Sequence, residues 1–245
     1  MRNQVEIASE VKNSSSVSTL AHETRKNKQR LSMLVIAAFA VSIAVISCKK
    51  DGDDSDGATI DKITATVEGG AKYNGVITKV KMVAYGLSEE GVIATGNWNN
   101  GGFSIAFPKT VDTKYLQLVV EDGMGVDATY SINTAKWCRD IYFEGYDAND
   151  EYVCDFYYGK SSNNSYTEVN YIYVDSDVNI TCNDTYGDEE WERTDDYSLT
   201  LKKGWNVAYL SESWSEVDGK EIYQEEYKTT AVNGLKWYSD EDVDW

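Results

Sequence analysis

Apolar and polar residues alternate along the chain from Ile60 onward, and no helical period competes with that alternation. At residues 103–107 every second position is apolar, and residues 60–67 follow the same pattern. Successive side chains of a β-strand point to opposite faces of a sheet. A two-residue period therefore predicts strands with one buried and one solvated face. No segment after Ile60 shows the 3.6-residue period of an amphipathic helix, so an all-β fold is expected.

Turn-forming residues divide these strands into hairpins. Residues 80–95 contain a loop flanked by glycines between two apolar runs, and residues 140–158 contain an Asx-rich turn at 147–150. Such turns reverse the chain between antiparallel strands. The second turn predicts that Cys154 lies opposite Phe143 on the neighbouring strand.

Many short strands favour a β-sandwich of immunoglobulin-like or transthyretin-like topology, with a lipocalin-like barrel as the alternative. Residues 103–116 align without gaps on residues 197–210, which is typical of a duplicated chain. Duplication predicts two sandwich units in tandem, 60–126 and 127–245, whereas the alternative is one larger sandwich. The same alignment places an insertion within residues 159–196, which is expected to be a long, functional loop.

The N-terminal segment, residues 1–47, predicts export and is excluded from the fold. Four basic residues at 25–30 precede an uncharged run at 31–47, and Cys48 follows directly. A basic region, an apolar run and a small residue before the cut describe a secretory signal. The run is short for a membrane span, and an uncleaved single-span anchor is the alternative. The residues before position 25 are either an extended n-region or lie upstream of the true start.

Residues 45–48, VISC, resemble a bacterial lipobox, where the signal is cut before a cysteine that becomes acylated. Acyl chains on Cys48 would anchor the mature N-terminus. Residues 48–59 form an acidic, flexible tether. This tether, with LKKGWN at 201–206 and GLKWY at 234–238, resembles surface lipoproteins of Bacteroidetes that are built from β-sandwich domains. The resemblance implies a lipid anchor in the outer membrane and exposure at the cell surface. It implies no activity.

The charge of the chain excludes several classes of function. The formal net charge is −18, and removing residues 1–47 deletes more basic than acidic side chains. A nucleic-acid partner is not expected, because phosphate binding needs a basic face. The single histidine, His22, lies before the cut, which removes imidazole bases and histidine-ligated zinc. The chain is not expected to be an enzyme, and a two-carboxylate glycosidase is the residual alternative.

The remaining cysteines, Cys138, Cys154 and Cys182, are odd in number, so at least one thiol is free even in an oxidising compartment. Without histidine no base is available to activate a catalytic thiol. We expect three small buried hydrophobic side chains, although Cys182 could pair with either of the others.

Calcium is the candidate cation. Asp175, Asp177 and Asn179 alternate along one predicted strand and place oxygen ligands on one face. Ca²⁺ takes six to eight such oxygens, and clustered loops of a sandwich can supply them. The alternative is that these residues make turns and solvate the surface.

Trp98, Trp191 and Trp214 lie in polar, turn-like sequence. Exposed rings beside amides and carboxylates suit sugars, because the ring stacks on the apolar sugar face and the polar groups bind hydroxyls. The first hypothesis is therefore a non-catalytic surface module that binds a glycan, with calcium assisting, and it predicts aromatics clustered on one exposed face. The second is a structural or adhesive component that assembles with other envelope proteins through strand edges, with residues 171–174 as the candidate edge.

Overall fold

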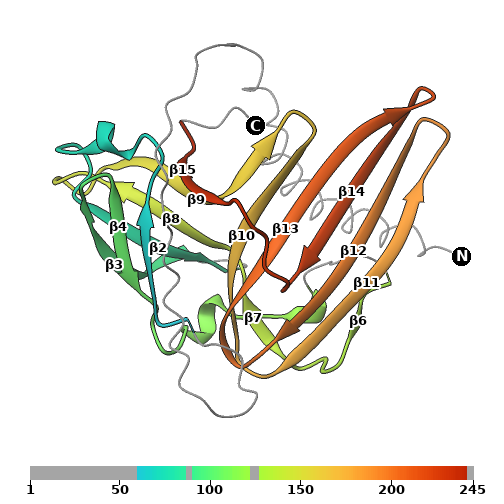
Figure 1. Cartoon of the computed structure of the whole chain (residues 1–245). Helices are drawn as coiled ribbons and strands as arrows, with labels where there is room; N and C mark the ends of the chain where they lie inside the picture. The colour runs from blue at the N-terminus through green and yellow to red at the C-terminus, as the bar shows by residue number, and fades with distance from the viewer. Residues whose placement is uncertain (1–59, 87–89, 122–126, 242–245) are drawn as a thin grey trace, which may run out of the picture. The chain divides into compact units, whose positions relative to one another are not determined.

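The computed structural model describes residues 60–86, 90–121 and 127–241, and the export signal, Cys48 and the tether lie outside the described residues. The described part is an all-β domain without α-helices, which confirms the expected class. Its strands form one large sheet (Figure 1), and the pair β12 and β14 is the one parallel pair of strands in it. No helix of the described residues is long and apolar enough to cross a bilayer.

The N-terminal part contributes short strands and 3₁₀ turns. The strands are β1 (Lys62–Thr66), β2 (Lys79–Tyr85), β3 (Glu90–Asn99), β4 (Gly102–Ala106), β5 (Gln117–Leu118), β6 (Thr129–Tyr130) and β7 (Lys136–Cys138). The 3₁₀ turns are η1 (Gly70–Tyr73), η2 (Thr113–Tyr115) and η3 (Val119–Glu121).

The C-terminal part contributes the longer strands. These are β8 (Ile141–Tyr146), β9 (Tyr152–Ser162), β10 (Ser165–Val174), β11 (Val178–Gly187), β12 (Trp191–Leu201), β13 (Gly204–Val217), β14 (Lys220–Lys228) and β15 (Lys236–Ser239). The order in the sheet is β1-β4-β3-β2-β8-β9-β10-β13-β14-β12-β11-β6, while β15 pairs with β9, and β7 pairs with β10 and β5.

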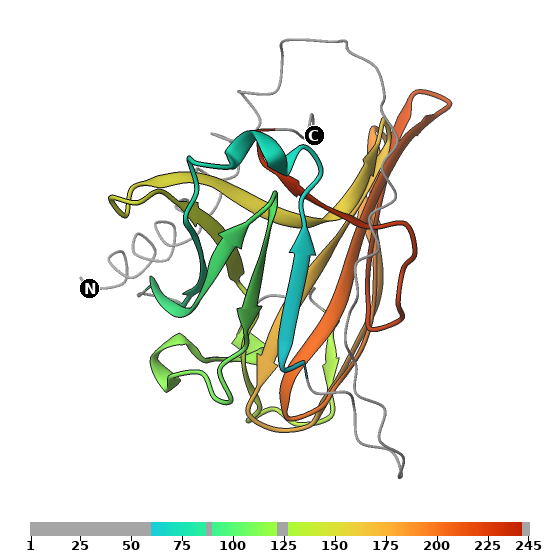
Figure 2. The ribbon, with the colours of Figure 1, turned by 60° about the vertical axis from the view of Figure 1, so that its left-hand side comes forward.

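Strand β10 separates two hydrophobic cores. Its odd-numbered side chains, Tyr171 and Tyr173, belong to the first core, to which β1 and β2 contribute aliphatic side chains and β3, β4, β8, β9 and β15 contribute aromatic ones. Its even-numbered side chains, Ile172 and Val174, belong to the second core, which is completed by β11–β14 and by Val119, Ala135 and Trp137. Figure 2 shows β1, β3 and β4 as a layer that faces the longer C-terminal strands.

The prediction that residues 171–174 form a strand edge is wrong. This segment lies within β10, which pairs with β13 on one side and with β9 and β7 on the other. Four of its side chains are buried, as a strand at the centre of a sheet with a core on each face requires.

The predicted long loop at 159–196 is also wrong, because the segment contains the end of β9, all of β10 and β11, and the start of β12. The two aligned segments differ as well. Residues 197–210 contain the end of β12 and the start of β13, which are separated in the sheet by β14, whereas β4 is followed by a loop and η2. One sheet crosses the proposed boundary at residue 127, since β2 pairs with β8.

The three thiols, Cys138, Cys154 and Cys182, are buried and free, as expected. The turn after β8 follows the expected Asx chemistry, but Cys154 lies opposite Gly145 rather than Phe143. A bulge after Gly145 accounts for one of these two positions, because one strand of a bulged pair carries an extra residue, and the turn, which is centred on Asn149, accounts for the other.

Candidate functional site

The outer parts of β11–β14 continue beyond the second core as two long hairpins (Figure 1). The β13–β14 hairpin closes with Asp218 and Gly219, which both have positive φ (54° and 81°). Two such residues form the tight turn that matches the twist of antiparallel strands. At the β11–β12 turn, Asp188 accepts hydrogen bonds from the backbone N–H of Glu190 (2.8 Å) and Trp191 (3.1 Å). These turns hold the four strands in register far from the core.

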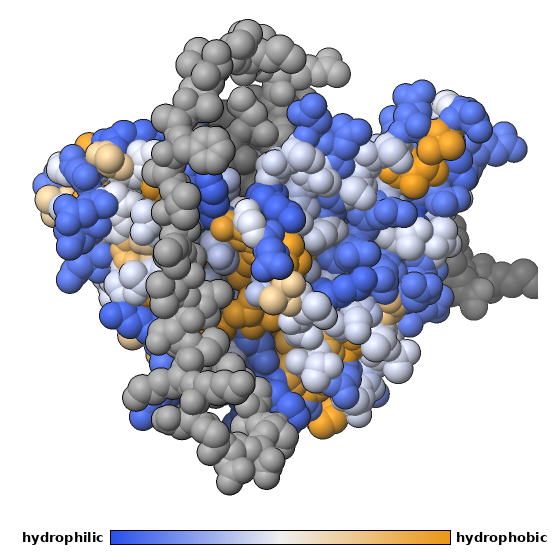
Figure 3. Space-filling model, in the orientation of Figure 1, coloured by the Kyte–Doolittle hydropathy of each residue, from blue (hydrophilic) through white to orange (hydrophobic). Residues whose placement is uncertain are grey.

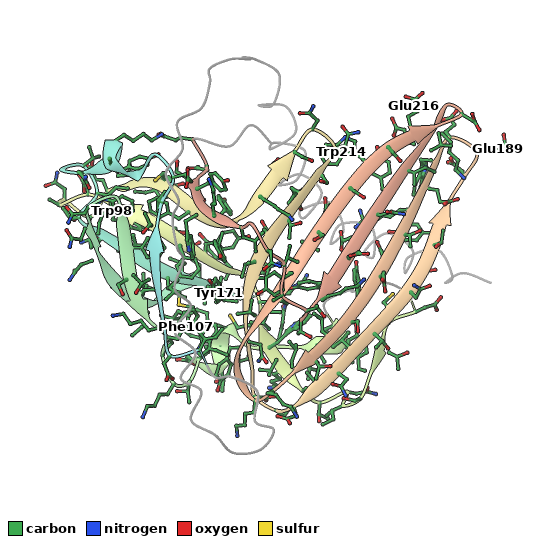
Figure 4. All side chains as sticks on the ribbon, viewed as in Figure 1. Trp98, Phe107, Tyr171, Glu189, Trp214 and Glu216 are labelled. Atoms are coloured by element: carbon green, nitrogen blue, oxygen red, sulfur yellow. The ribbon has the colours of Figure 1, made fainter. Side chains whose placement is uncertain are left out.

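An aromatic row crosses the extended strands on the face that carries the second core. It consists of Trp214 on β13, Tyr223 on β14, Arg193 on β12 and Tyr186 on β11, each paired with the next in register. Neighbouring strands lie about 4.8 Å apart, so these four side chains are adjacent to one another on the sheet surface. In Figure 4, Trp214 projects from β13 at some distance from the turn, and Glu216 lies closer to it.

A carboxylate row runs beside the aromatic row, two residues closer to the core along each strand. It consists of Tyr166 on β10, Glu212 on β13, Glu225 on β14, Asp195 on β12 and Asp184 on β11. Side chains two residues apart on a strand share a face, so both rows line the same surface. We call the two rows together the platform.

The rings of the platform are accessible. Trp214 is 39% exposed, Tyr223 is 40% exposed and Tyr186 is 43% exposed. Trp191, which precedes Arg193 on the same face of β12, packs its ring edge-on against Tyr186 with the ring centroids 5.9 Å apart. Large aromatic side chains usually bury their apolar area, so a row of open rings on one sheet face is a candidate binding surface.

Arg193 neutralises the centre of the carboxylate row. Its Nε lies 2.8 Å from Asp195 Oδ1, and its other guanidinium nitrogen pairs with Glu225. Tyr197 donates a hydrogen bond to Glu225 Oε1 (2.6 Å), and Tyr186 donates to Asp195 Oδ2 (3.3 Å). Asp195 is only 4% exposed, so these contacts replace the water that the carboxylate has lost.

Glu212 forms no ion pair of its own within the described residues. Burial, a hydrogen bond between the Glu212 and Glu225 carboxyls and the charge of Glu225 raise the pKa of Glu212 to about 7, although the hydrogen bond from Tyr166 opposes the rise. Two neighbouring carboxyls that share a proton resist full ionisation. Near neutral pH the row therefore offers both a hydrogen-bond donor and acceptor oxygens.

The structure brings two of the predicted binding residues, Trp191 and Trp214, to this face and places the third elsewhere. Trp98 lies in the first core and is only 8% exposed. Its ring stacks on Phe156 with the centroids 5.1 Å apart, and its Nε1 donates to Asn74 Oδ1 (3.1 Å). Trp98 therefore supports the fold and is not available to a surface ligand.

The predicted calcium ligands make separate structural contacts. Asp175 accepts a hydrogen bond from the backbone N–H of Lys136 (2.9 Å), and Asp177 binds both Lys202 Nζ (3.0 Å) and the backbone N–H of Lys203 (2.8 Å). The backbone N–H of Asn179 donates to Ser131 Oγ. In the described part of the chain, no three His, Cys, Asp or Glu side chains are grouped to hold a metal ion.

Sequence reasoning missed most of the platform, including Tyr186, Arg193, Glu212, Tyr223 and Glu225. A signal was present in β14, where acids and tyrosines alternate with other residues at positions 221, 223, 225 and 227. A two-residue period made of aromatic and charged side chains, instead of aliphatic ones, indicates a functional face of a strand. The pairing of this strand with β12 and β13 was not visible in the sequence.

A second aromatic surface lies on β2, β8 and β9 and is internally satisfied. Glu144 is buried and accepts hydrogen bonds from Tyr85 (3.1 Å) and Tyr146 (2.6 Å). Lys81 Nζ lies 3.6 Å from the centroid of the Tyr146 ring and 2.6 Å from Asp150 Oδ1. The chain's own lysine thus occupies the position that a ligand cation would take, and the platform remains the stronger candidate.

Comparison with known proteins gives no match: no family model fits the chain, and no curated protein or solved structure is significantly similar to it. The geometry of the platform is therefore the starting point for its function.

Proposed function

We propose that this protein is a membrane-anchored surface lipoprotein that acts as a non-catalytic binding module, with a glycan as its ligand. The observation that carries the proposal is the exposed row of Trp214, Tyr223 and Tyr186 beside a row of carboxyl groups on one sheet face. The hypothesis of a binding module predicted such a cluster of aromatics.

The chemistry of the two rows suits a sugar chain. The rings offer flat apolar surfaces for stacking, and the adjacent carboxyls offer acceptors and one donor for hydroxyl groups. Because the side chains stand on paired strands, little conformational entropy is lost when they engage a ligand. An aromatic row across several strands fits an extended chain better than a compact metabolite.

The carboxyl geometry supports binding without catalysis. Glu212 and Glu225 are close enough to share a hydrogen bond. Retaining glycosidases hold their two carboxyls about 5 Å apart, and inverting enzymes hold them further apart, so that the reacting sugar lies between them. A pair in mutual contact leaves no room for that sugar carbon.

The location belongs to the same proposal. Acyl chains on Cys48 would anchor the protein in the outer membrane, and the acidic tether at 48–59 would hold the platform away from the bilayer, facing the cell exterior. We also propose that the domain has an immunoglobulin-like or transthyretin-like sandwich topology. Packing of the Phe107 and Phe143 rings from one layer against Tyr171 of the other supports this topology.

A glycan array probed with the full chain tests the proposal. We expect saturable binding to a defined polysaccharide, and we expect Trp214→Ala and Tyr223→Ala each to weaken it by about tenfold or more, because each removes a stacking ring. Tyr152→Ala is the matched control, since Tyr152 is 52% exposed on β9, away from the platform. No binding to any glycan, or equal losses in the control, would contradict the proposal.

The array is repeated with calcium and with a chelator. Loss of binding with chelator would make calcium part of the site. Substituting Asp177 would then test whether the metal lies near Asp175, Asp177 and Asn179 or elsewhere. Binding that is unchanged by chelator assigns recognition to the rings and carboxyls alone.

An assembly role through strand edges is the second candidate, and the edge of β11 favours it. Strand β6 covers β11 only at Ile180 and Thr181, so within the described residues the segment 182–187 has a partner strand on one side only. An open edge can accept a strand from another chain. Sedimentation of the full chain in detergent over a range of concentrations distinguishes the two, since assembly through this edge requires a size that increases with concentration.

A further inference from the structure

We propose that the platform prefers glycan chains that carry free amino groups, such as chains of glucosamine, over neutral chains, and rejects chains of uronic acids. This inference rests on the proposed glycan-binding function and names the chemical class of its ligand. It is carried by the distribution of charge around the exposed rings.

Acidic side chains flank the aromatic row on both sides. Glu216 and Glu221 lie on the side of the turns, and Glu212, Glu225, Asp195 and Asp184 form the row on the side of the core. A ring stacked on Trp214 or Tyr223 would therefore place its substituents over carboxyl groups on either side. Fixed charges of one sign select ligands of the opposite sign.

Among the described residues, Arg193 is the only basic side chain on this face of β11–β14 outside the second core, and it is already engaged. Its guanidinium already contacts both Asp195 and Glu225, so two carboxylates offset its single positive charge. Lys220 and Lys228 stand on the opposite face, where they pair with Glu192 and Asp196. A uronic acid on the platform would thus meet carboxylates without a cation.

Two carboxylates of the site are available to a ligand cation. Within the described residues, neither Asp184 nor Glu216 takes part in an ion pair. They lie at opposite ends of the platform, on β11 and on β13 respectively. Ammonium groups also bind favourably over aromatic faces, so Trp214 and Tyr223 add to the attraction.

Figure 3 shows the hydropathy of the outer strands from one side. Hydrophilic residues cover most of the outer strands in this view, apart from a small apolar patch near the β13–β14 turn, where Val217 is 54% exposed. Such a small patch does not point to a large apolar partner at this end.

The test measures binding of the full chain to three hexasaccharides of equal length: glucosamine, N-acetylglucosamine and galacturonate. We expect the glucosamine chain to bind roughly tenfold more tightly than the N-acetylated chain, as two or three partly exposed ion pairs would give, and the galacturonate chain not to bind. The preference should shrink as salt is raised, because exposed charges are screened.

The variant Asp184→Asn/Glu216→Gln tests the charge directly. We expect it to reduce the preference for glucosamine over N-acetylglucosamine by at least about threefold, since two unpaired charges are removed. Glu226→Gln is the matched control, because this acid is adjacent in sequence to Glu225 but lies on the opposite face, beside Lys228. Its preference should equal that of the unmodified chain.

The outcomes separate this inference from the proposed function. If the neutral chain binds as tightly as glucosamine and Trp214→Ala weakens both, the platform binds glycans and the inference is wrong. If a lysine hexapeptide binds as well as the glucosamine chain, recognition is general for cations and the inference is again wrong. If none of the three chains binds and the array is also empty, the proposed function fails with it.

Discussion

Individual side chains of the platform hold charges that the fold has partly removed from water. Asp195 and Glu225 share Arg193, while burial and the neighbouring Glu225, its cross-strand partner, raise the pKa of Glu212. A buried ion pair adds little net stability, but removing one partner is costly because the other charge stays behind. The same side chains therefore couple the stability of the domain to pH and to substitution.

Replacing Arg193 by Met should destabilise the domain by about 2–3 kcal/mol, because Asp195 and Glu225 lose their cation; the loss is smaller than for a fully buried pair because 36% of the Arg193 side chain is exposed. Urea unfolding of the full chain measures the change. Lys202→Met is the matched control: its pair with Asp177 is open to solvent and should contribute less than about 1 kcal/mol. Equal effects of the two substitutions would contradict the account.

Glu212 should make the domain less stable as pH rises. Its pKa is raised in the folded state from 4.5 to about 7, so the stabilising contribution of the protonated form is complete below pH 4.5 and is lost as pH rises through 7. Glu212→Gln removes this dependence. We expect the unmodified chain to lose more unfolding free energy than the variant between pH 5 and pH 8, by on the order of 1 kcal/mol after solvent screening.

Asp155 also has a raised pKa, to about 6, from burial and the nearby Asp240, so the whole domain shows more than one titration. The difference between the unmodified chain and Glu212→Gln isolates Glu212. If the unfolding free energies of the unmodified chain and of Glu212→Gln depend on pH in the same way, the pKa of Glu212 is not raised in the folded state and the account is contradicted.

The length of the strands and the geometry of their turns place the platform beyond the second core. The β13–β14 hairpin carries Trp214, Glu212, Tyr223 and Glu225, and its two-residue turn fixes their register. A one-residue slip would move all four side chains to the other face. The binding surface therefore depends on turn chemistry as much as on the platform residues.

Gly219→Val should fray this hairpin without disturbing the cores. Gly219 has φ of 81° and no heavy atom within 4 Å of the point where a Cβ would stand, so the cost is backbone strain of about 1 kcal/mol or more rather than a clash. Amide hydrogen exchange should become faster in the outer parts of β13 and β14 and stay unchanged in β2 and β8. Unchanged exchange at the hairpin would show that the turn does not hold the register.

The whole molecule was predictable only in part. The alternation of apolar residues predicted the all-β class, and the odd number of cysteines, with no histidine to activate a thiol, predicted three buried thiols. The continuous sheet was not predictable, because a local period does not specify which distant strands pair. Strand β10 illustrates the limit: its four apolar side chains at 171–174 suggest an edge from the sequence alone, whereas in the structure they belong to two cores.

The candidate site was likewise predictable only in part. The polar neighbours of Trp191 and Trp214 correctly predicted that these residues lie on the platform face. The same criterion is wrong for Trp98, because the asparagines beside it in the sequence are exposed while its own indole is buried and donates to Asn74 of another element. Tyr223 and Glu225 needed the parallel pairing of β14 with β12 to become neighbours of Arg193 and Asp195. Such pairing brings together residues that are about 30 positions apart in the chain.

The measurement that tests the central claim most directly is an NMR titration of the tryptophan indole N–H signals in the full chain, with the glycan that binds best on the array. We predict that the signals of Trp191 and Trp214 shift with ligand concentration, while those of the buried Trp98, Trp137 and Trp237 remain in place. Shifts confined to the buried indoles, or saturable binding with no change at Trp214, would contradict the assignment of the platform as the binding surface.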